Sequence, residues 1–254
     1  EKTVDLMRRF FCFILILISV YMMATKGFSP ERIYFRRASS AAEGSPLATV
    51  HLSTENIPDA QIQLAVPYIS QLPELRNGCE ITSSAMILNY YGFTVDKCLL
   101  ADDYLPKLYP YITADPEEGY MGDPYTLWGY YCMTKPIVTA INEYLEDQSI
   151  PLWQAEDISG VSIKELQNYI ANGFPVQVWV TKDFEKPTYY DTFLLPDATQ
   201  PYANLHCVVI TGMSASEFYY NDPLYGKHSV SFEKFESAFS AIGNRAVYLR
   251  KSRD

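Results

Sequence analysis

Cys79 is the residue whose type and position are best suited to chemistry. It follows Gly78 and directly precedes an apolar run, 81–91, that is predicted to form a helix ended by Gly92. A cysteine at the start of a helix lies next to unpaired backbone N–H groups and the positive end of the helix dipole. Both features favour the thiolate, which is the nucleophilic form of cysteine. The sequence therefore predicts a reactive thiol here.

His206 and Asp222 supply the two groups that a cysteine nucleophile needs beside it. His206 opens a run of β-forming residues, and Asp222 lies in a tight Asn-Asp-Pro turn. A thiol, an imidazole base and an acid that orients the imidazole are the side chains of a cysteine hydrolase. The alternative roles are structural: an inert core cysteine, a buried core histidine and an aspartate that only forms a turn.

The chain contains further residues that compete for these roles. His51 lies in a stretch that resembles a linker, and His228 lies in a short expected strand. Asp123, in a Gly-Asp-Pro-Tyr sequence, is the competing acid, and we expect it in a loop on the substrate side. Cys207 follows His206 directly and should face the opposite side of the strand, in the core.

The composition limits the classes of partner. The chain has 254 residues, which allows one or two domains, and 48% of them are hydrophobic, which is ample for a core. Residues 1–37 carry a net charge of +4, so the remainder carries −14 of the total of −10. Such an acidic body argues against nucleic acid as a partner, because phosphate binding needs a basic face. The 21 tyrosines fit core and sheet packing, with sugar or peptide binding as the alternative.

The first residues differ from the rest of the chain. Arg8 and Arg9 precede an almost uncharged apolar run, 10–24. Its length lies between that of a signal-peptide core and that of a membrane-spanning helix. Because no suitable cleavage site follows directly, we favour an uncleaved membrane anchor over 1–26, with a removed signal peptide or a buried core helix as alternatives. Either an anchor or a signal peptide would put the body of the protein outside the cytoplasm. We expect a linker over 27–62 and one domain over 63–254.

The remaining cysteines allow a disulfide but give no sign of a metal site. Cys98 and Cys132 bracket a loop-rich stretch and could be joined in an oxidising compartment. The chain has no Cys-x-x-Cys or His-x-x-x-His pair, so zinc is disfavoured. A glycine-rich phosphate loop is also missing from the sequence. We therefore expect no metal and no organic cofactor.

Helical patterns dominate the first part of the chain and strand patterns the second. An edge strand is expected over 64–70, weakened by Pro67, and loops rich in Tyr, Pro, Gly and Asp over 93–134, with a short helix near 96–104. A helix is expected at 135–147, and a capping box at Ser162 opens another that stops at Gly173. The later expected elements are strands at 175–181, 206–213, 217–221, 228–232 and 245–249, and a helix at 232–242. This order indicates an α+β fold with a mostly antiparallel sheet.

Seven short blocks within roughly residues 64–249 carry a resemblance to a known enzyme family. They lie at 66–71, 78–83, 86–92, 122–125, 175–180, 206–212 and 220–223. Taken together, these blocks resemble the peptidase family thirty-nine-like branch of the papain-fold cysteine peptidases. The resemblance implies a papain-like fold, in which an N-terminal helical part with the nucleophile helix packs on the sheet.

The resemblance also implies a role for four residues. Cys79 would be the nucleophile, His206 the base and Asp222 the group that orients the imidazole. Gln71 matches the family glutamine whose side-chain amide helps to bind the oxyanion, together with the backbone N–H of Cys79. The alternative for Gln71 is an ordinary polar residue in a loop.

These observations predict an extracytoplasmic thiol hydrolase, most simply a cysteine endopeptidase held at a membrane by its N-terminus. Its partner would be a peptide or protein substrate, cleaved through an acyl-enzyme. One alternative is a cell-wall amidase or acyl transferase on the same fold, and another is a binding module on a scaffold that has lost catalysis. Relatives fused to export transporters cut leader peptides after paired glycines. This chain shows no transporter span or nucleotide-binding motif, so that substrate is not carried over.

Overall fold

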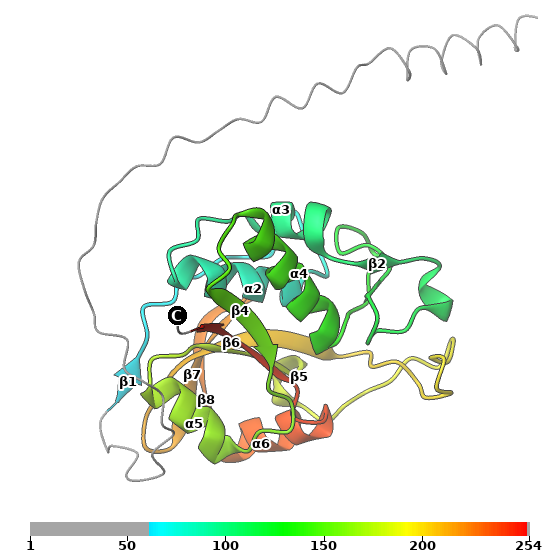
Figure 1. Cartoon of the computed structure of the whole chain (residues 1–254). Coiled ribbons are helices and arrows are strands. Elements are labelled where there is room, and N and C mark those ends of the chain that lie inside the picture. Colours follow the sequence, from blue (N-terminus) through cyan, green and yellow to red (C-terminus); the bar gives the residue numbers. More distant parts are fainter. Residues whose placement is uncertain (1–60, 253–254) are drawn as a thin grey trace, which may run out of the picture. The chain divides into compact units, whose positions relative to one another are not determined.

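The structure of the chain is a computed structural model, which describes residues 61–252 (Figure 1). Its helices are α2 (Cys79–Tyr90), α3 (Lys97–Leu99), α4 (Thr134–Asp147), α5 (Ile163–Ala171) and α6 (Phe232–Ala241). A π-helical turn follows α3, and two 3-10 turns occur in loops: Leu100–Tyr104, Tyr111–Thr113 and Lys182–Phe184. The strands are β1 (Ile62–Gln63), β2 (Lys107–Leu108), β3 (Tyr120–Met121), β4 (Trp153–Asp157), β5 (Val176–Thr181), β6 (Leu205–Met213), β7 (Glu217–Asp222), β8 (Gly226–Ser231) and β9 (Ala246–Lys251).

An antiparallel sheet lies between two layers of helices. Its strands follow the order β4-β9-β5-β6-β7-β8, and β1 pairs with β6. Helices α2 and α4 cover one face of this sheet, whereas α5 and α6 cover the other (Figure 1). β2 and β3 form a small parallel pair outside it. The α+β class with a mostly antiparallel sheet, as the sequence predicts, is therefore confirmed.

The middle of the sheet is buried on both faces. All six residues of β5 are buried, because the strand lies between β9 and β6 and beneath helices on either side. Alternate side chains point to opposite faces. Trp179 and Cys207 pack in the cluster that contains α2, whereas Val178 and Val208 pack in the cluster that contains α5 and α6. β6, which carries His206, is thus held rigidly between two cores.

Most expected elements are present within a few residues of their predicted ends, but one strand is missing and others were not predicted. The expected strand over 64–70 is wrong. Only Ile62–Gln63 pairs with β6, and the last ladder-like bond is from Leu64 N to Thr211 O (2.7 Å). Pro67 lacks an N–H and cannot continue the ladder, so the chain leaves the sheet here. Conversely, the sequence pattern does not predict the short strands β2 and β3, or β4, which pairs with β9.

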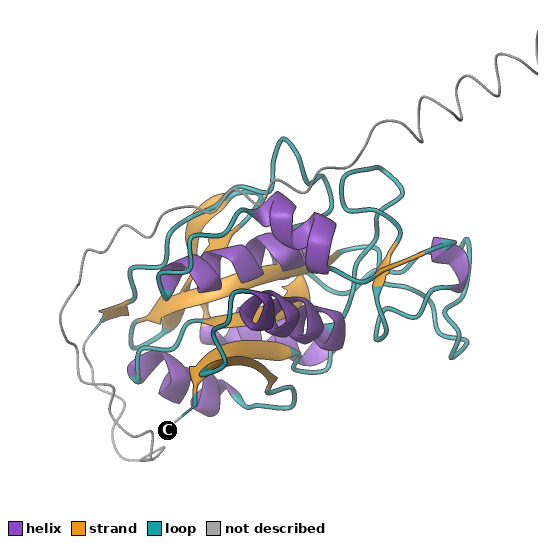
Figure 2. Cartoon of the chain, turned by 45° about the horizontal axis from the view of Figure 1, so that its top comes forward, coloured by secondary structure: helices purple, strands orange, loops and turns teal. Residues whose placement is uncertain are grey.

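Aromatic side chains tie the long loops together. The segment around β2 and β3 is mostly loop, as Figure 2 shows. Tyr111 stacks on Tyr130, with ring centroids 4.8 Å apart, and its ring also contacts Trp128 and Phe193 at 6.1 and 5.7 Å. Phe193 belongs to the loop between β5 and β6, so these contacts join two loops that are distant in sequence. The tyrosine-rich composition therefore serves packing here.

The disulfide that the sequence allows between Cys98 and Cys132 is not formed in the structure. All four cysteines within residues 61–252 are free thiols. Cys132 is fully buried, where its backbone N–H and C=O bond to Glu80 and Trp179. Cys98 is half-buried at the first turn of α3. The two residues are positioned by different elements, and sequence spacing alone did not reveal this.

Several expectations concern residues that lie outside the described part of the chain. They are the anchor over 1–26, nearly all of the linker over 27–62, and His51. Within residues 61–252, no helix combines the length and apolar character that a membrane crossing requires.

Candidate active site

A tight double turn sets the start of the cysteine helix. Gln71 O accepts a hydrogen bond from Leu75 N (2.9 Å), and Leu75 O accepts one from Gly78 N (3.3 Å). A Cβ on Gly78 would lie 2.6 Å from the Cβ of Leu75, so only glycine fits this close approach. α2 then begins at Cys79, with Gly78 as its N-cap. The predicted position of Cys79 at a helix start is confirmed.

Polar contacts fix α2 against the sheet. Ten of its twelve residues are buried, which marks it as a central helix. Ser84 Oγ donates to Gln177 Oε1 (3.0 Å) on β5, and Gln177 Nε2 donates to the carbonyl of Glu80 (2.9 Å). Ser83 Oγ donates to the carbonyl of Cys207 on β6 (3.4 Å). These bonds hold the first two turns of α2 against β5 and β6.

His206 and Asp222 form a buried pair. Nε2 of His206 lies 2.9 Å from Oδ1 of Asp222, and the two residues are 4% and 5% exposed. The same Oδ1 accepts the backbone N–H groups of Leu224 (2.8 Å) and Tyr225 (3.2 Å). Burial acts to raise the pKa of Asp222, but the hydrogen bond and charge of His206 and the two N–H groups outweigh it and lower that pKa. The ionised carboxylate thus holds Nε2 and leaves Nδ1 as the second ring nitrogen.

The residues that compete for these roles lie in other environments. Oδ1 of Asp123 accepts the N–H of Tyr125 (3.0 Å) within its own turn. His228 is exposed, and its Nε2 contacts the carbonyl of Tyr225 (2.9 Å). Cys207 is fully buried in the core, as expected. The fold therefore pairs His206 with Asp222, which is the pairing that the sequence predicts.

Gln71 connects the cysteine turn to the aspartate turn. Its backbone N–H donates to Pro223 O (2.9 Å), next to Asp222, and its side chain is buried. Nε2 donates to Arg76 O (2.8 Å), which fixes the amide orientation because the reverse would set two oxygens against each other. One amide hydrogen remains, while Oε1 is buried without a hydrogen-bond partner among the described residues. The site thus holds an amide donor that its own turn does not fully satisfy.

Residues 63–247, which include all four candidate site residues, match the model of the Peptidase_C39 like family. The chain belongs to this family. An uncharacterised protein of Bacillus subtilis (strain 168), YvpB, is 32% identical over 184 residues, which are 70% of this chain and 71% of that protein. A crystal structure of a candidate C39-like peptidase from Bacillus anthracis is 33% identical, covers 76% of this chain and all of its own, and has a TM-score of 0.66. This C39-like chain therefore has the papain-like fold that the resemblance implied.

In this C39-like chain, the thiol of Cys79 contacts a carboxyl group. Its Sγ lies 3.2 Å from Oε2 of Glu80, the next residue. Oε1 of Glu80 accepts the backbone N–H of Cys132 (3.1 Å), and Glu80 is only 1% exposed. Within residues 61–252, no hydrogen bond joins Cys79 Sγ to the His206 ring. In the free protein, the partner of the thiol is thus Glu80.

This environment changes the acidity of both groups. Burial raises the pKa of the Cys79 thiol well above its usual value, and the charge of Glu80 raises it further. Desolvation and the neighbouring acid therefore act against the thiolate in the free protein, in the opposite direction to the helix start. Burial also raises the pKa of Glu80 to about 7. Hydrogen bonds from its own N–H, from Cys79 and from the N–H of Cys132, and the charge of His206, lower this pKa but do not outweigh burial.

Glu80 is absent from the site residues that the sequence predicts. An acid in the first turn of a helix is usually explained by the helix dipole at an exposed end. Its neighbours in the sequence could have indicated that it is buried. Glu80 follows Cys79 and precedes a run of residues that are small or apolar on every side of the helix. A helix that is apolar on all its faces is usually buried, so an acidic residue within it is expected to be buried as well.

A small cavity adjoins the histidine pair of this C39-like site. It has a volume of about 160 Å³ and is lined by His206, Asp222, Thr181, Tyr220 and His228, among others. Within residues 61–252, no group of three or more His, Cys, Asp or Glu side chains is arranged to hold a metal ion. The chemistry that the described side chains offer is acid–base and nucleophilic.

Proposed function

We propose that the protein is a cysteine peptidase that cleaves peptide amides through a Cys79-His206-Asp222 triad. The observation that carries the proposal is the buried His206–Asp222 pair, with a 2.9 Å contact and an Asp222 carboxylate anchored by two backbone N–H groups. Such an anchored acid fixes the tautomer and orientation of an imidazole base. Membership of a peptidase family supports a peptide or protein as the substrate.

The proposed reaction follows from the groups present. His206 takes the proton of the Cys79 thiol, and the thiolate attacks the carbonyl carbon of the substrate. The oxyanion accepts hydrogen bonds from the free amide hydrogen of Gln71 and from the N–H of Cys79, which has no acceptor within the helix. The intermediate then collapses, the C–N bond breaks, and the imidazolium gives its proton to the leaving amine. His206 next deprotonates a water molecule, which hydrolyses the thioester.

Substrate binding has to change the surroundings of the sulfur before this reaction can start. In the free protein the thiol contacts Glu80, and its pKa is raised. A rise in pKa lowers the thiolate fraction at neutral pH, so the free protein is expected to react slowly with alkylating reagents. This contact is also the observation that favours the rival function, a binding module without catalysis.

Labelling of the full chain tests the proposal. The protein is treated with an epoxide inhibitor of cysteine peptidases, and the modified residue is identified by mass spectrometry. Casein and peptidoglycan are offered side by side as substrates. We expect label on Cys79, cleavage of casein, and loss of both in Cys79→Ala.

The controls separate the alternatives. Cys207→Ala, which removes a buried core thiol, should leave the label in place. Release of peptidoglycan fragments without cleavage of casein would assign the site to a cell-wall amidase. Hydrolysis that persists in Cys79→Ala would refute the triad. A protein that neither cleaves nor takes up label in the presence of either substrate would be a binding module.

We also propose that the body of the protein lies outside the cytoplasm. The support is the apolar run over 10–24. It follows Arg8 and Arg9, as the apolar part of an anchor or signal segment follows positive charges. An alkaline phosphatase fusion after residue 254 should be active in cells if the body is exported. An inactive fusion at normal expression would contradict this location.

A further inference from the structure

A second and larger cavity lies between the long loops and the start of β9. Its volume is about 500 Å³, within the range of sites that hold small molecules or single side chains. Met133 and the rings of Tyr189 and Tyr202, whose centroids are 5.3 Å apart, form part of its apolar wall. A long aliphatic chain could lie along this wall.

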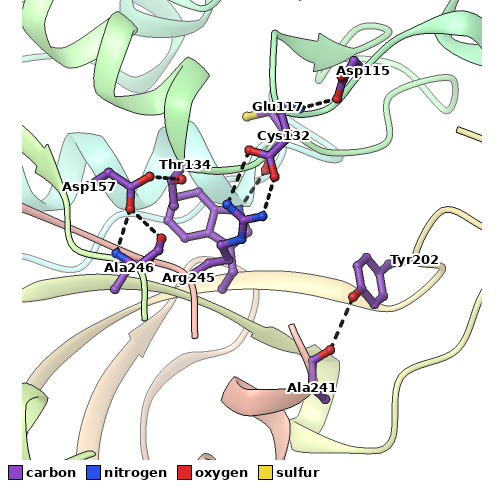
Figure 3. Close-up of polar contacts among 11 residues, drawn as sticks. Asp115, Glu117, Cys132, Thr134, Asp157, Tyr202, Ala241, Arg245 and Ala246 are labelled. Atoms are coloured by element: carbon purple, nitrogen blue, oxygen red, sulfur yellow. Dashed lines mark hydrogen bonds and ion pairs between the residues drawn. The ribbon is translucent and has the colours of Figure 1, made fainter. Parts of the chain in front are cut away.

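Among the described residues that line this cavity, the cation is Arg245, and it is already paired. Nη2 and Nη1 of Arg245 contact the two carboxylate oxygens of Glu117 at 2.5 and 3.4 Å (Figure 3). In such a bidentate pair, two N–H groups of the guanidinium donate to the two carboxylate oxygens in the plane of the group. Arg245 is therefore not free to bind an anionic ligand, and the pair contributes no net charge to the cavity.

Two other carboxylates in the lining are not balanced by a cation. Oδ1 of Asp115 accepts the N–H of Glu117 (2.9 Å), and Oδ1 of Asp197 accepts the N–H (3.0 Å) and hydroxyl (2.7 Å) of Thr199. These bonds hold the two side chains in place. Within residues 61–252, no Lys, Arg or His lies within ion-pair distance of either carboxylate. The cavity thus has two negative charges to offer to a ligand.

An apolar wall with aromatic rings and two fixed carboxylates suits one kind of group. Lys and Arg side chains lay their aliphatic stems along apolar surface and keep a charged head at its edge. A cationic head also gains from the faces of aromatic rings. An acidic group would be repelled, and a neutral group would leave both charges uncompensated.

The sheet register places the backbone of Arg245, at the edge of this cavity, two strands away from β6, the strand that carries His206. Trp179 N donates to Arg245 O (3.1 Å) on one side of β5, and Trp179 pairs with Cys207 on the other side. Neighbouring strands are about 4.8 Å apart, so the backbones of Arg245 and Cys207 are about 10 Å apart. His206 precedes Cys207 directly. An extended peptide covers about 10 Å with about three residues.

We propose that this cavity is a specificity subsite that binds a Lys or Arg side chain of a peptide substrate, about three residues from the bond that is cut. The subsite rests on the proposed peptidase function, but its affinity for a cation does not depend on catalysis. A binding measurement and a cleavage measurement therefore test the two separately.

The binding test uses the full chain with Cys79→Ala, so that no turnover occurs. Two short fluorescein-labelled peptides are compared by fluorescence anisotropy, one with a central arginine and one with citrulline, which has the same shape without the charge. We expect the arginine peptide to bind a few-fold more tightly, because Asp197 is exposed and Asp115 half-buried, and ion pairs at such sites are weak. The preference should shrink as salt is raised from about 0.05 M to about 0.5 M.

Isosteric variants assign the preference to this cavity. Asp115→Asn with Asp197→Asn keeps the oxygens that accept the backbone N–H groups and removes both charges, so the loops should keep their conformation. We expect the preference for arginine to disappear in this double variant and to persist in Asp191→Asn, a control in the same loop that does not line the cavity. Equal binding of the two peptides, including no binding of either, or a preference that survives in the double variant would overturn the proposal.

The cleavage test uses the wild-type chain and a peptide library derived from a whole proteome. We expect Lys and Arg to be enriched at one fixed position, about three residues from the cut bond. Cleavage without such enrichment would overturn the subsite and leave the peptidase function standing. No cleavage, together with selective binding of the arginine peptide, would overturn the peptidase function and leave the cationic subsite standing.

Discussion

The contact between Cys79 and Glu80 controls the chemistry of the site at the scale of single residues. Burial and a carboxyl group 3.2 Å from the sulfur both act against the thiolate. The pKa of Glu80, raised by burial to about 7, means that its charge changes within the physiological range. The acidity of the thiol is therefore coupled to the protonation of its neighbour.

We predict that Glu80→Gln makes Cys79 more reactive towards iodoacetamide. The variant keeps an oxygen for the N–H of Cys132 but removes the charge that opposes the thiolate, so the pKa of the thiol falls. A lower thiol pKa raises the thiolate fraction, so the alkylation rate near pH 7 should rise several-fold. The measurement is the rate of alkylation of Cys79 from pH 6 to 10, followed by mass spectrometry. Glu118→Gln, at an exposed position, is the control, and a profile that does not move would show that Glu80 has only a structural role.

At the scale of elements, the start of α2 depends on the turn before it. The glycine at position 78 allows the chain to pass so close to Leu75 that no Cβ fits. The turn leads directly into Cys79, while Gln71 at its other end bonds to Pro223 beside the aspartate turn. One short segment therefore sets the relative positions of the proposed nucleophile, amide donor and acid.

Gly78→Ala is expected to destabilise the protein by about 1–3 kcal/mol, the usual result of forcing extra volume into a packed site. It should also lower turnover, because the turn must open and carry the sulfur with it. Urea unfolding and kcat on a cleaved peptide measure the two effects. Gly92→Ala, at the end of the same helix, is the comparison. Its φ of +87° makes alanine destabilising there as well, but no atom lies near the added Cβ, so kcat should be kept. Equal effects of the two variants on kcat would contradict a special role for this turn.

At the scale of the whole molecule, Glu80 lies between α2 and the core of the sheet, where an ionised carboxylate is poorly solvated. Its pKa is about 4.5 when exposed and about 7 in the folded protein. Between these values the unfolded chain loses its proton while the folded chain keeps it, so stability falls as pH rises through this window. The fall amounts to about 3 kcal/mol and ends near pH 7, where the folded form ionises as well.

We therefore expect Glu80→Gln to flatten the pH dependence of stability. The difference in unfolding free energy between variant and wild type should shift in favour of the variant by about 3 kcal/mol between pH 4.5 and pH 7.5. Urea unfolding at these two pH values measures it, and other titrating groups cancel in the difference. Parallel pH curves for the two proteins would contradict the raised pKa of Glu80.

The sequence alone was sufficient for the fold class and for most elements. Periodicity, the capping box at Ser162 and terminal glycines are local signals, and each acts within a few residues of the structure that it predicts. β4 was missed because it is short and partly exposed. A strand was predicted over 64–70 because the residue types there favour one. Pro67 lacks the N–H that the ladder needs, and the prediction gave this too little weight.

For the candidate site, the chain determined by itself which residue types were available and in what order: a cysteine at a helix start, a histidine on a strand and an aspartate in a turn. Only the tertiary structure decided their environment. The His206–Asp222 pairing, the carboxyl of Glu80 on the sulfur, and the free thiols of Cys98 and Cys132 all depend on contacts between distant segments. Burial and through-space charge set acidity and pairing, and neither can be calculated from residues that are adjacent only in sequence.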